Sequence, residues 1–122
     1  MIPVPPDLVR PGEVFKVHPG YPNFWVSDHG RVWSERGRRL VGRLGPGASQ
    51  GKPYPMDKKY VQVTLESKTG RTEFVHTLVL ETFVSARPEG HDGDHINHDR
   101  KDNRLSNLRW RLRSENRADT VR

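Results

Sequence analysis

The spacing of the apolar residues changes near the middle of the chain, and this change limits the folds open to it. From Tyr60 to Leu65 apolar and polar side chains alternate, which is typical of a β-strand with one buried face. From Val75 to Phe83 the apolar residues recur at nearly helical spacing, and Pro88 requires such a helix to end before it. The chain is therefore predicted to combine short strands with a short helix in an α+β fold.

Turn residues and β-prone runs predict further short elements on both sides of this helix. The runs Phe24–Ser27 and Arg31–Ser34 flank Asp28-His-Gly30, whose composition suits a tight turn, so we expect a hairpin there. The other expected elements are a strand within Arg38–Leu44, a loop at Gly45–Pro55, strands at Thr72–Val75, Gly90–Ile96 and Leu108–Leu112, a polar loop at Asn97–Asn107, and a final helix from Glu115 to Thr120 capped by Ser114.

Length and composition exclude several classes of protein. The 122 residues suit one ordinary domain, and a hydrophobic share of 32% predicts a small core. The absence of cysteine excludes disulfides and thiolate zinc sites. The sequence has neither an apolar run near the roughly 18 residues that a membrane helix needs nor the pattern of a signal peptide. We therefore expect a soluble, cytoplasmic protein with no membrane partner.

Basic residues are concentrated in two segments. The formal net charge is +6; residues 31–43 carry five basic and one acidic side chain, and residues 100–122 carry eight and three. Most of the basic residues are arginines, which suit bidentate contacts with phosphates and base edges. A solvated surface would also explain such clusters. Their separation on an otherwise acidic chain favours double-stranded DNA as the partner.

The polar residues between Asp94 and Asn116 include groups suited to hydrolysis. Hydrolysis of a phosphodiester needs a base that deprotonates water and a divalent cation that neutralises the leaving oxygen. Asp94 and His95 are adjacent on an expected strand, so their side chains should start toward opposite faces, and a bend would be required to bring both to one phosphate. Asn116, in the first turn of the expected last helix, could face back across the hairpin.

The order and spacing of these residues resemble a known family. The stretch from Phe74 to about Asp119, with Asp94-His95, Asn103, Asn107 and Ser114-Glu-Asn116, resembles the HNH endonucleases, in particular the phage-type homing endonuclease branch. A weaker similarity covers Gly20–Ser34, which resembles the module that precedes the HNH core in those enzymes. Four prolines among the first twelve residues predict an extended arm at 1–12. The resemblance implies a β-rich DNA-binding module at 13–73 and a ββα-metal HNH core at 74–122.

The resemblance also implies a role for each site residue. Asp94 and Asn116 would bind the metal, and His95 would be the general base. Asn107 would brace the loop and orient His95 through a hydrogen bond, and His76 would lie near the site. Many relatives have His where this chain has Asn116, and the oxygen pair of this chain favours Mg²⁺ or Mn²⁺ over zinc.

Other interpretations of the same residues stay open. His91, His95 and His98 could form a three-histidine metal site. Asn107 could cap a loop, and Asn116 could be an ordinary helix residue. The arginines expected to contact DNA are Arg31, Arg36, Arg38, Arg39, Arg43, Arg104, Arg109 and Arg111.

The resemblance implies a metal-dependent DNA endonuclease of phage origin that acts in the host cytoplasm and leaves 5′-phosphate and 3′-hydroxyl ends. One copy of the site predicts a monomer that nicks duplex DNA. Because the chain ends soon after Asn116, we expect relaxed specificity or a further phage or host protein that supplies it. The main alternative is a DNA-binding protein without catalysis that uses the basic hairpin module. A metal-storage or structural phage protein with no affinity for DNA is the third possibility.

Overall fold

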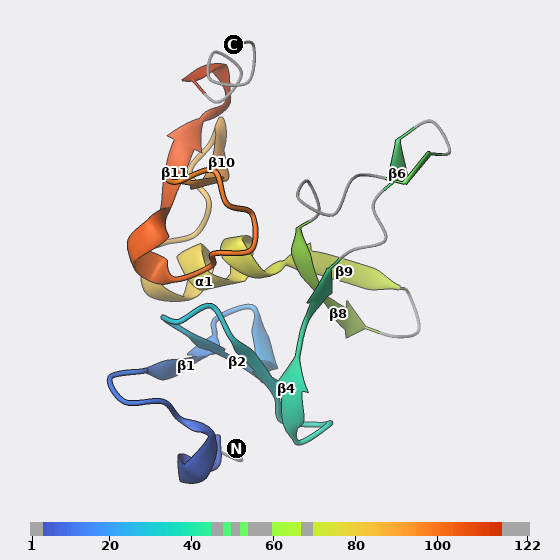
Figure 1. Ribbon diagram of the computed structural model, residues 1–122, viewed down its shortest axis with the longest axis vertical. Helices are drawn as coiled ribbons and strands as arrows, with labels where there is room; N and C mark the ends of the chain where they lie inside the picture. The colour runs from blue at the N-terminus through green and yellow to red at the C-terminus, as the bar shows by residue number, and fades with distance from the viewer. Residues whose placement is uncertain (1–3, 45–47, 50–51, 54–59, 67–69, 116–122) are drawn as a thin grey trace.

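A four-stranded antiparallel sheet occupies the N-terminal part of the fold. The computed structural model describes residues 4–44, 48–49, 52–53, 60–66 and 70–115 (Figure 1). A 3-10 turn at Pro6–Leu8 (η1) precedes the sheet, so the expected extended arm contains a helical turn. The strands lie in sequence order as β1 (Phe15–His18), β2 (Tyr21–Ser27), β3 (Val32–Ser34) and β4 (Arg39–Val41).

The hairpin expected around Asp28-His-Gly30 is present as β2 and β3. Trp25 lies opposite Trp33 in the register, and Gly30 takes a positive φ of 83° in the turn. Strand β1 was not among the expected elements. Its fully buried residue is His18, so the strand lacks the apolar alternation that marks a half-buried strand.

Two further β-ladders follow. Strands β5 (Arg43–Leu44), β8 (Val61–Glu66) and β9 (Arg71–Phe74) form a three-stranded sheet in the order β5-β8-β9. Strands β6 (Ala48–Ser49) and β7 (Lys52–Pro53) pair within the segment expected to be a loop. The single strand expected over 38–44 is divided into β4 and β5 at Gly42, whose φ is 132°.

The C-terminal part contains one helix and one hairpin among the described elements. Helix α1 (Val75–Phe83) starts directly after β9, and β10 (His91–His95) pairs antiparallel with β11 (Leu108–Leu112). The connecting loop ends in a 3-10 turn, η3 (Leu105–Asn107). Residues 113–115 are helical, and the rest of the expected final helix lies outside the described residues. Within the described ranges, no helix is long and apolar enough to cross a membrane.

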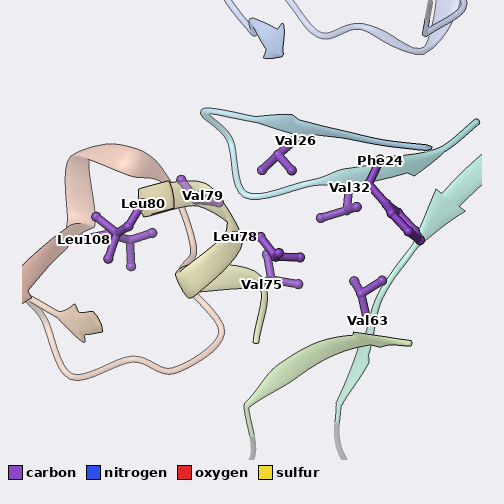
Figure 2. Packing of buried hydrophobic residues seen from close by; sticks show 9 residues of the cluster. All are labelled: Phe24, Val26, Val32, Val63, Val75, Leu78, Val79, Leu80 and Leu108. Carbon is purple, nitrogen blue, oxygen red and sulfur yellow. The ribbon is translucent and has the colours of Figure 1, made fainter. Parts of the chain in front are cut away.

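One hydrophobic core joins the N-terminal sheet to the helix and hairpin. Helix α1 lies between the sheet and the β10–β11 hairpin (Figure 1) and contacts both. The core residues come from β2, β3, β8, α1 and β11 (Figure 2), and they are Phe24, Val26, Val32, Val63, Val75, Leu78, Val79, Leu80 and Leu108. The α+β architecture is confirmed. The boundary expected between 73 and 74 falls inside this shared core.

A buried ion pair fixes the segment before β1 to the β2–β3 turn. Arg31 Nε donates to Glu13 Oε2 at 2.8 Å, and Arg31 Nη2 donates to the carbonyl of Leu8 at 2.6 Å. The Glu13 side chain is fully buried. Burial would raise the pKa of Glu13, but hydrogen bonds from Arg31 and from the backbone of Arg10 outweigh it and lower that pKa to about 2. Glu13 is therefore ionised at neutral pH.

Candidate active site

The β10–β11 hairpin presents Asp94 and His95 on opposite faces. Asp94 is paired with Arg109 and His95 with Leu108 in the antiparallel register. Successive side chains of a strand alternate between faces. His95 accordingly faces α1, where its ring lies 4.6 Å from that of His76, whereas Asp94 contacts arginines of β11. The sequence had indicated this alternation.

His95 is held in one tautomer by Asn103. His95 Nε2 lies 2.7 Å from Asn103 Oδ1, and both side chains are buried. Because an amide oxygen only accepts, Nε2 carries the hydrogen and the lone pair is on Nδ1. Burial lowers the pKa of His95, an effect that the Asn103 hydrogen bond and the charge of Asp94 oppose. A neutral imidazole whose Nδ1 lone pair has no hydrogen-bond partner among the described residues is suited to accept a proton from water.

The hydrogen bond expected from Asn107 to His95 is made by Asn103 instead. The Asn107 side chain braces the loop: its Oδ1 accepts from the backbone of Asn97 at 3.1 Å, and its Nδ2 donates to Asn97 Oδ1 and to the carbonyl of Asp102, both at 2.9 Å. Its carbonyl also accepts from Ile96 N. These bonds direct the Asn107 amide across the loop and away from His95, so the bracing part of its expected role fits the structure.

His76 lies beside His95, as the resemblance implied. It is buried in α1, and its ring is stacked on Phe74 at 5.5 Å and tilted against Tyr60 at 5.4 Å. Burial, followed by the charges of His95 and Arg87, lowers the pKa of His76 to about 3. Such a weak base is poorly suited to deprotonate water near neutral pH. The geometry therefore favours His95 as the base.

Asp94 is ion-paired in this structure. Its Oδ2 accepts from Arg109 Nε at 2.8 Å and lies 3.9 Å from Arg111 Nη1, and 13% of its side chain is exposed. Arg109 and Arg111, both expected to contact DNA, thus lie at the candidate site itself. A cation at Asp94 would compete with Arg109 for the same oxygen.

The three-histidine metal site is contradicted. His91 and His95 are separated by three residues of one strand, about 13 Å at the usual strand rise. His91 Nδ1 lies 2.8 Å from the carbonyl of Glu89, and His98 is exposed in the loop. The described residues contain no group of three or more His, Cys, Asp or Glu side chains that could hold a metal.

The donors that remain suit a hard cation with few protein ligands. Mg²⁺ is commonly bound by one or two carboxylates together with waters and phosphate oxygens. Asp94 supplies a partly exposed carboxylate. It lies one residue before the end of β10, where the loop that contains Asn103 begins. Asn116, the second expected ligand, lies outside the described residues.

Comparison with known families gives a match over the segment that contains Asp94, His95 and Asn103. The HNH endonuclease family model matches residues 73–118, which include α1 and the β10–β11 hairpin. The likeness to the HNH endonucleases thus covers residues 73–118 of the 122 residues. No curated protein matches the chain significantly.

A solved structure extends the likeness beyond the HNH segment. The chain is similar to a structure described as DNA binding and cleavage by the HNH homing endonuclease I-HmuI, with a TM-score of 0.66 and 25% identity. The likeness covers 88% of this chain and 57% of that one. It therefore reaches well into the N-terminal sheet, and this chain spans little more than half the length of its structural neighbour.

The arginines outside the HNH segment differ in their surroundings. Arg31 has a structural role, because it is engaged by Glu13 and Leu8. The others expected to contact DNA from this part, Arg36, Arg38, Arg39 and Arg43, are exposed. Arg36 and Arg39 line a groove of about 640 Å³ between β2, β4 and β8. In the HNH segment, Arg104 is exposed but paired with Asp102 at 2.7 Å.

Proposed function

We propose that this protein is a metal-dependent HNH endonuclease that hydrolyses phosphodiester bonds in double-stranded DNA. The observation that carries the proposal is the pair formed by His95 and Asp94. His95 is neutral and is held by Asn103 through Nε2, which leaves the lone pair on Nδ1, and the Asp94 carboxylate belongs to the preceding residue of the strand. A general base and an anionic ligand for a divalent cation are two groups that hydrolysis of a phosphodiester requires.

In the proposed reaction, His95 Nδ1 takes a proton from the attacking water while the water oxygen bonds to phosphorus. The bond between phosphorus and the 3′ oxygen breaks, and that oxygen takes a proton from solvent, which leaves a 3′-hydroxyl and a 5′-phosphate. Asp94 and Asn116 would hold one divalent cation, Mg²⁺ or Mn²⁺, which supplies positive charge beside the leaving oxygen when bound. Arg109 balances the charge of Asp94 in the free protein.

The exposed arginines of the N-terminal part would bind the DNA backbone. Removing Arg36, Arg38, Arg39 and Arg43 together should flatten the dependence of log Kd on log salt, because each lost phosphate contact removes about 0.9 from the slope. The measurement is a salt titration of binding to a short duplex. The double variant Arg36→Ala/Arg39→Ala should change this slope more than the control double variant Arg10→Ala/Lys16→Ala, which removes the same number of positive charges. Equal slopes would show that this surface does not contact the backbone.

A single site predicts that a monomer cuts one strand in each binding event. Supercoiled plasmid incubated with the protein and Mg²⁺ should turn first into open circles, and linear DNA should appear late, from nearby nicks on opposite strands. Early linear DNA, formed at a rate that rises more than proportionally with protein concentration, would show that a dimer placed by two-fold symmetry is the active species. Binding without any cleavage in Mg²⁺ or Mn²⁺ would favour the alternative of a non-catalytic DNA-binding protein.

The proposal also covers the sequence specificity of cleavage. Phosphate contacts carry affinity but no base information. We propose relaxed specificity, or a further protein that supplies it. Cleavage mapping on plasmids of unrelated sequence tests this, because dispersed nicks fit relaxed specificity and one recurrent site does not.

A further inference from the structure

The β2–β3 turn of the N-terminal sheet contacts the loop that holds the candidate base. The loop between β10 and β11 lies against this turn (Figure 1), and Leu105 N donates to the carbonyl of Asp28 at 2.8 Å. Asp28 and Leu105 are more than seventy residues apart in the sequence. The contact therefore joins the N-terminal sheet to the HNH hairpin at the candidate site.

Gly30 lies close to the Asn103 backbone in this contact. A Cβ built on Gly30 would lie 2.5 Å from the carbonyl oxygen of Asn103 and 2.6 Å from its carbonyl carbon and Cβ. These are backbone atoms and the root of a side chain, so they cannot move aside as the end of a flexible side chain could. The φ of +83° at Gly30 also disfavours any residue with a side chain.

Asn103 is the residue that fixes the tautomer of His95. It is buried, with 5% of its surface exposed, and its Oδ1 accepts from His95 Nε2 at 2.7 Å. A displaced Asn103 backbone would move this oxygen. Gly30, Asn103 and His95 thus form a continuous line of contacts from the sheet to the base.

Several hydrogen bonds hold the turn in its conformation. Ser27 Oγ accepts from the backbone N–H groups of His29 and Arg31, both at 3.1 Å, and Gly30 N donates to the Ser27 carbonyl. Ser27 is fully buried. The turn is also tied to the preceding segment, because Val14 N donates to Asp28 Oδ1 at 2.9 Å.

We propose that the turn at residues 28–30 is a positioning element for His95. Because Gly30 has no side chain, the Asn103 backbone can pack against the turn. This packing keeps Asn103 Oδ1 in hydrogen-bond contact with His95 Nε2. The N-terminal sheet is then part of the structure that orients the base, in addition to any contact with DNA. The effect on catalysis rests on the proposed nuclease function, whereas the effect on His95 orientation does not.

The test compares two glycines with similar positive φ, +83° at Gly30 and +77° at Gly12. Gly30→Ala and Gly12→Ala both place a side chain at positive φ, but a Cβ at Gly12 has no described atom within 4 Å. In a long-range ¹H–¹⁵N spectrum of ¹⁵N-histidine protein at fixed neutral pH, Gly30→Ala should shift or broaden the His95 Nε2–H signal. Gly12→Ala should leave it unchanged.

The cleavage rate supplies the second reading. Gly30→Ala should lower it by about 10²-fold at an equal folded fraction, as small displacements of catalytic groups do. If Gly30 acts through Asn103, then Gly30→Ala should have little further effect in an Asn103→Ala background. Additive losses in the double variant would overturn this route.

The outcomes separate this inference from the nuclease proposal. An unchanged His95 signal in folded Gly30→Ala would overturn the inference, whatever the protein does to DNA. A changed signal in a protein that never cleaves DNA would support the inference and contradict the nuclease proposal. If Gly30→Ala does not fold, Ser27→Ala removes the two hydrogen bonds inside the turn and should shift the same signal less strongly. No shift in a folded Ser27→Ala would then count against the inference.

Discussion

Replacing His95 with alanine is expected to lower the cleavage rate by about 10²–10⁴-fold, the usual contribution of a general base. Affinity for duplex DNA should change little, because a base stabilises the transition state rather than the bound complex. Single-turnover cleavage and equilibrium binding, measured on the same duplex, separate the two effects.

His91→Ala is the matched control. His91 lies on the same strand and its ring contacts the carbonyl of Glu89, away from His76 and Asn103. Its replacement should leave the rate nearly unchanged. A His95→Ala variant that cuts at the wild-type rate would remove His95 from the mechanism and leave the base unidentified.

Arg31→Ala is expected to destabilise the fold by about 3–5 kcal/mol, because it leaves the carboxylate of Glu13 buried without its partner. Denaturant unfolding, followed by tryptophan fluorescence, measures this loss. Arg104→Ala also breaks an arginine–carboxylate pair, that with Asp102, but Arg104 is largely exposed, and the unfolding midpoint should scarcely move. Equally small effects in both variants would show that water reaches Glu13.

Acid should remove the contribution of this ion pair from the wild-type protein. The pKa of Glu13 falls from 4.5 in the unfolded chain to about 2 in the fold. A depressed carboxylate pKa gives stability that is present above about pH 4.5 and is lost as the pH falls toward 2. The difference in unfolding free energy between wild type and Arg31→Ala should therefore narrow over that range. A difference that stays constant down to pH 2 would contradict the assignment.

Local patterns in the sequence predicted most of the elements. The Asp28-His-Gly30 turn gave the β2–β3 hairpin because turn residues and flanking β-prone runs act over short range. The period change at Val75 placed the start of α1. The Asp94-His95 pair was expected on a strand, and β10 places the two side chains on opposite faces as alternation requires.

Contacts that depend on how loops and distant segments fold together could not be predicted from the sequence. Asn103 and Asn107 lie in one loop, and which of them reaches His95 depends on how that loop folds around Asn97. Nothing near Arg31 in the chain marks it as the partner of Glu13, 18 residues earlier. The contact between Gly30 and Asn103 forms only when the sheet packs on the hairpin.

Whether His95 and a cation at Asp94 act together on DNA is tested most directly by cleavage of an end-labelled duplex. Wild-type protein with Mg²⁺ should release fragments that end in a 3′-hydroxyl and a 5′-phosphate. Wild-type protein in excess EDTA should give no fragments above background, and neither should His95→Ala or Asp94→Ala with Mg²⁺. Cleavage at the wild-type rate in EDTA or by either variant, or fragments that end in a 3′-phosphate, would contradict a metal-dependent hydrolysis that uses His95.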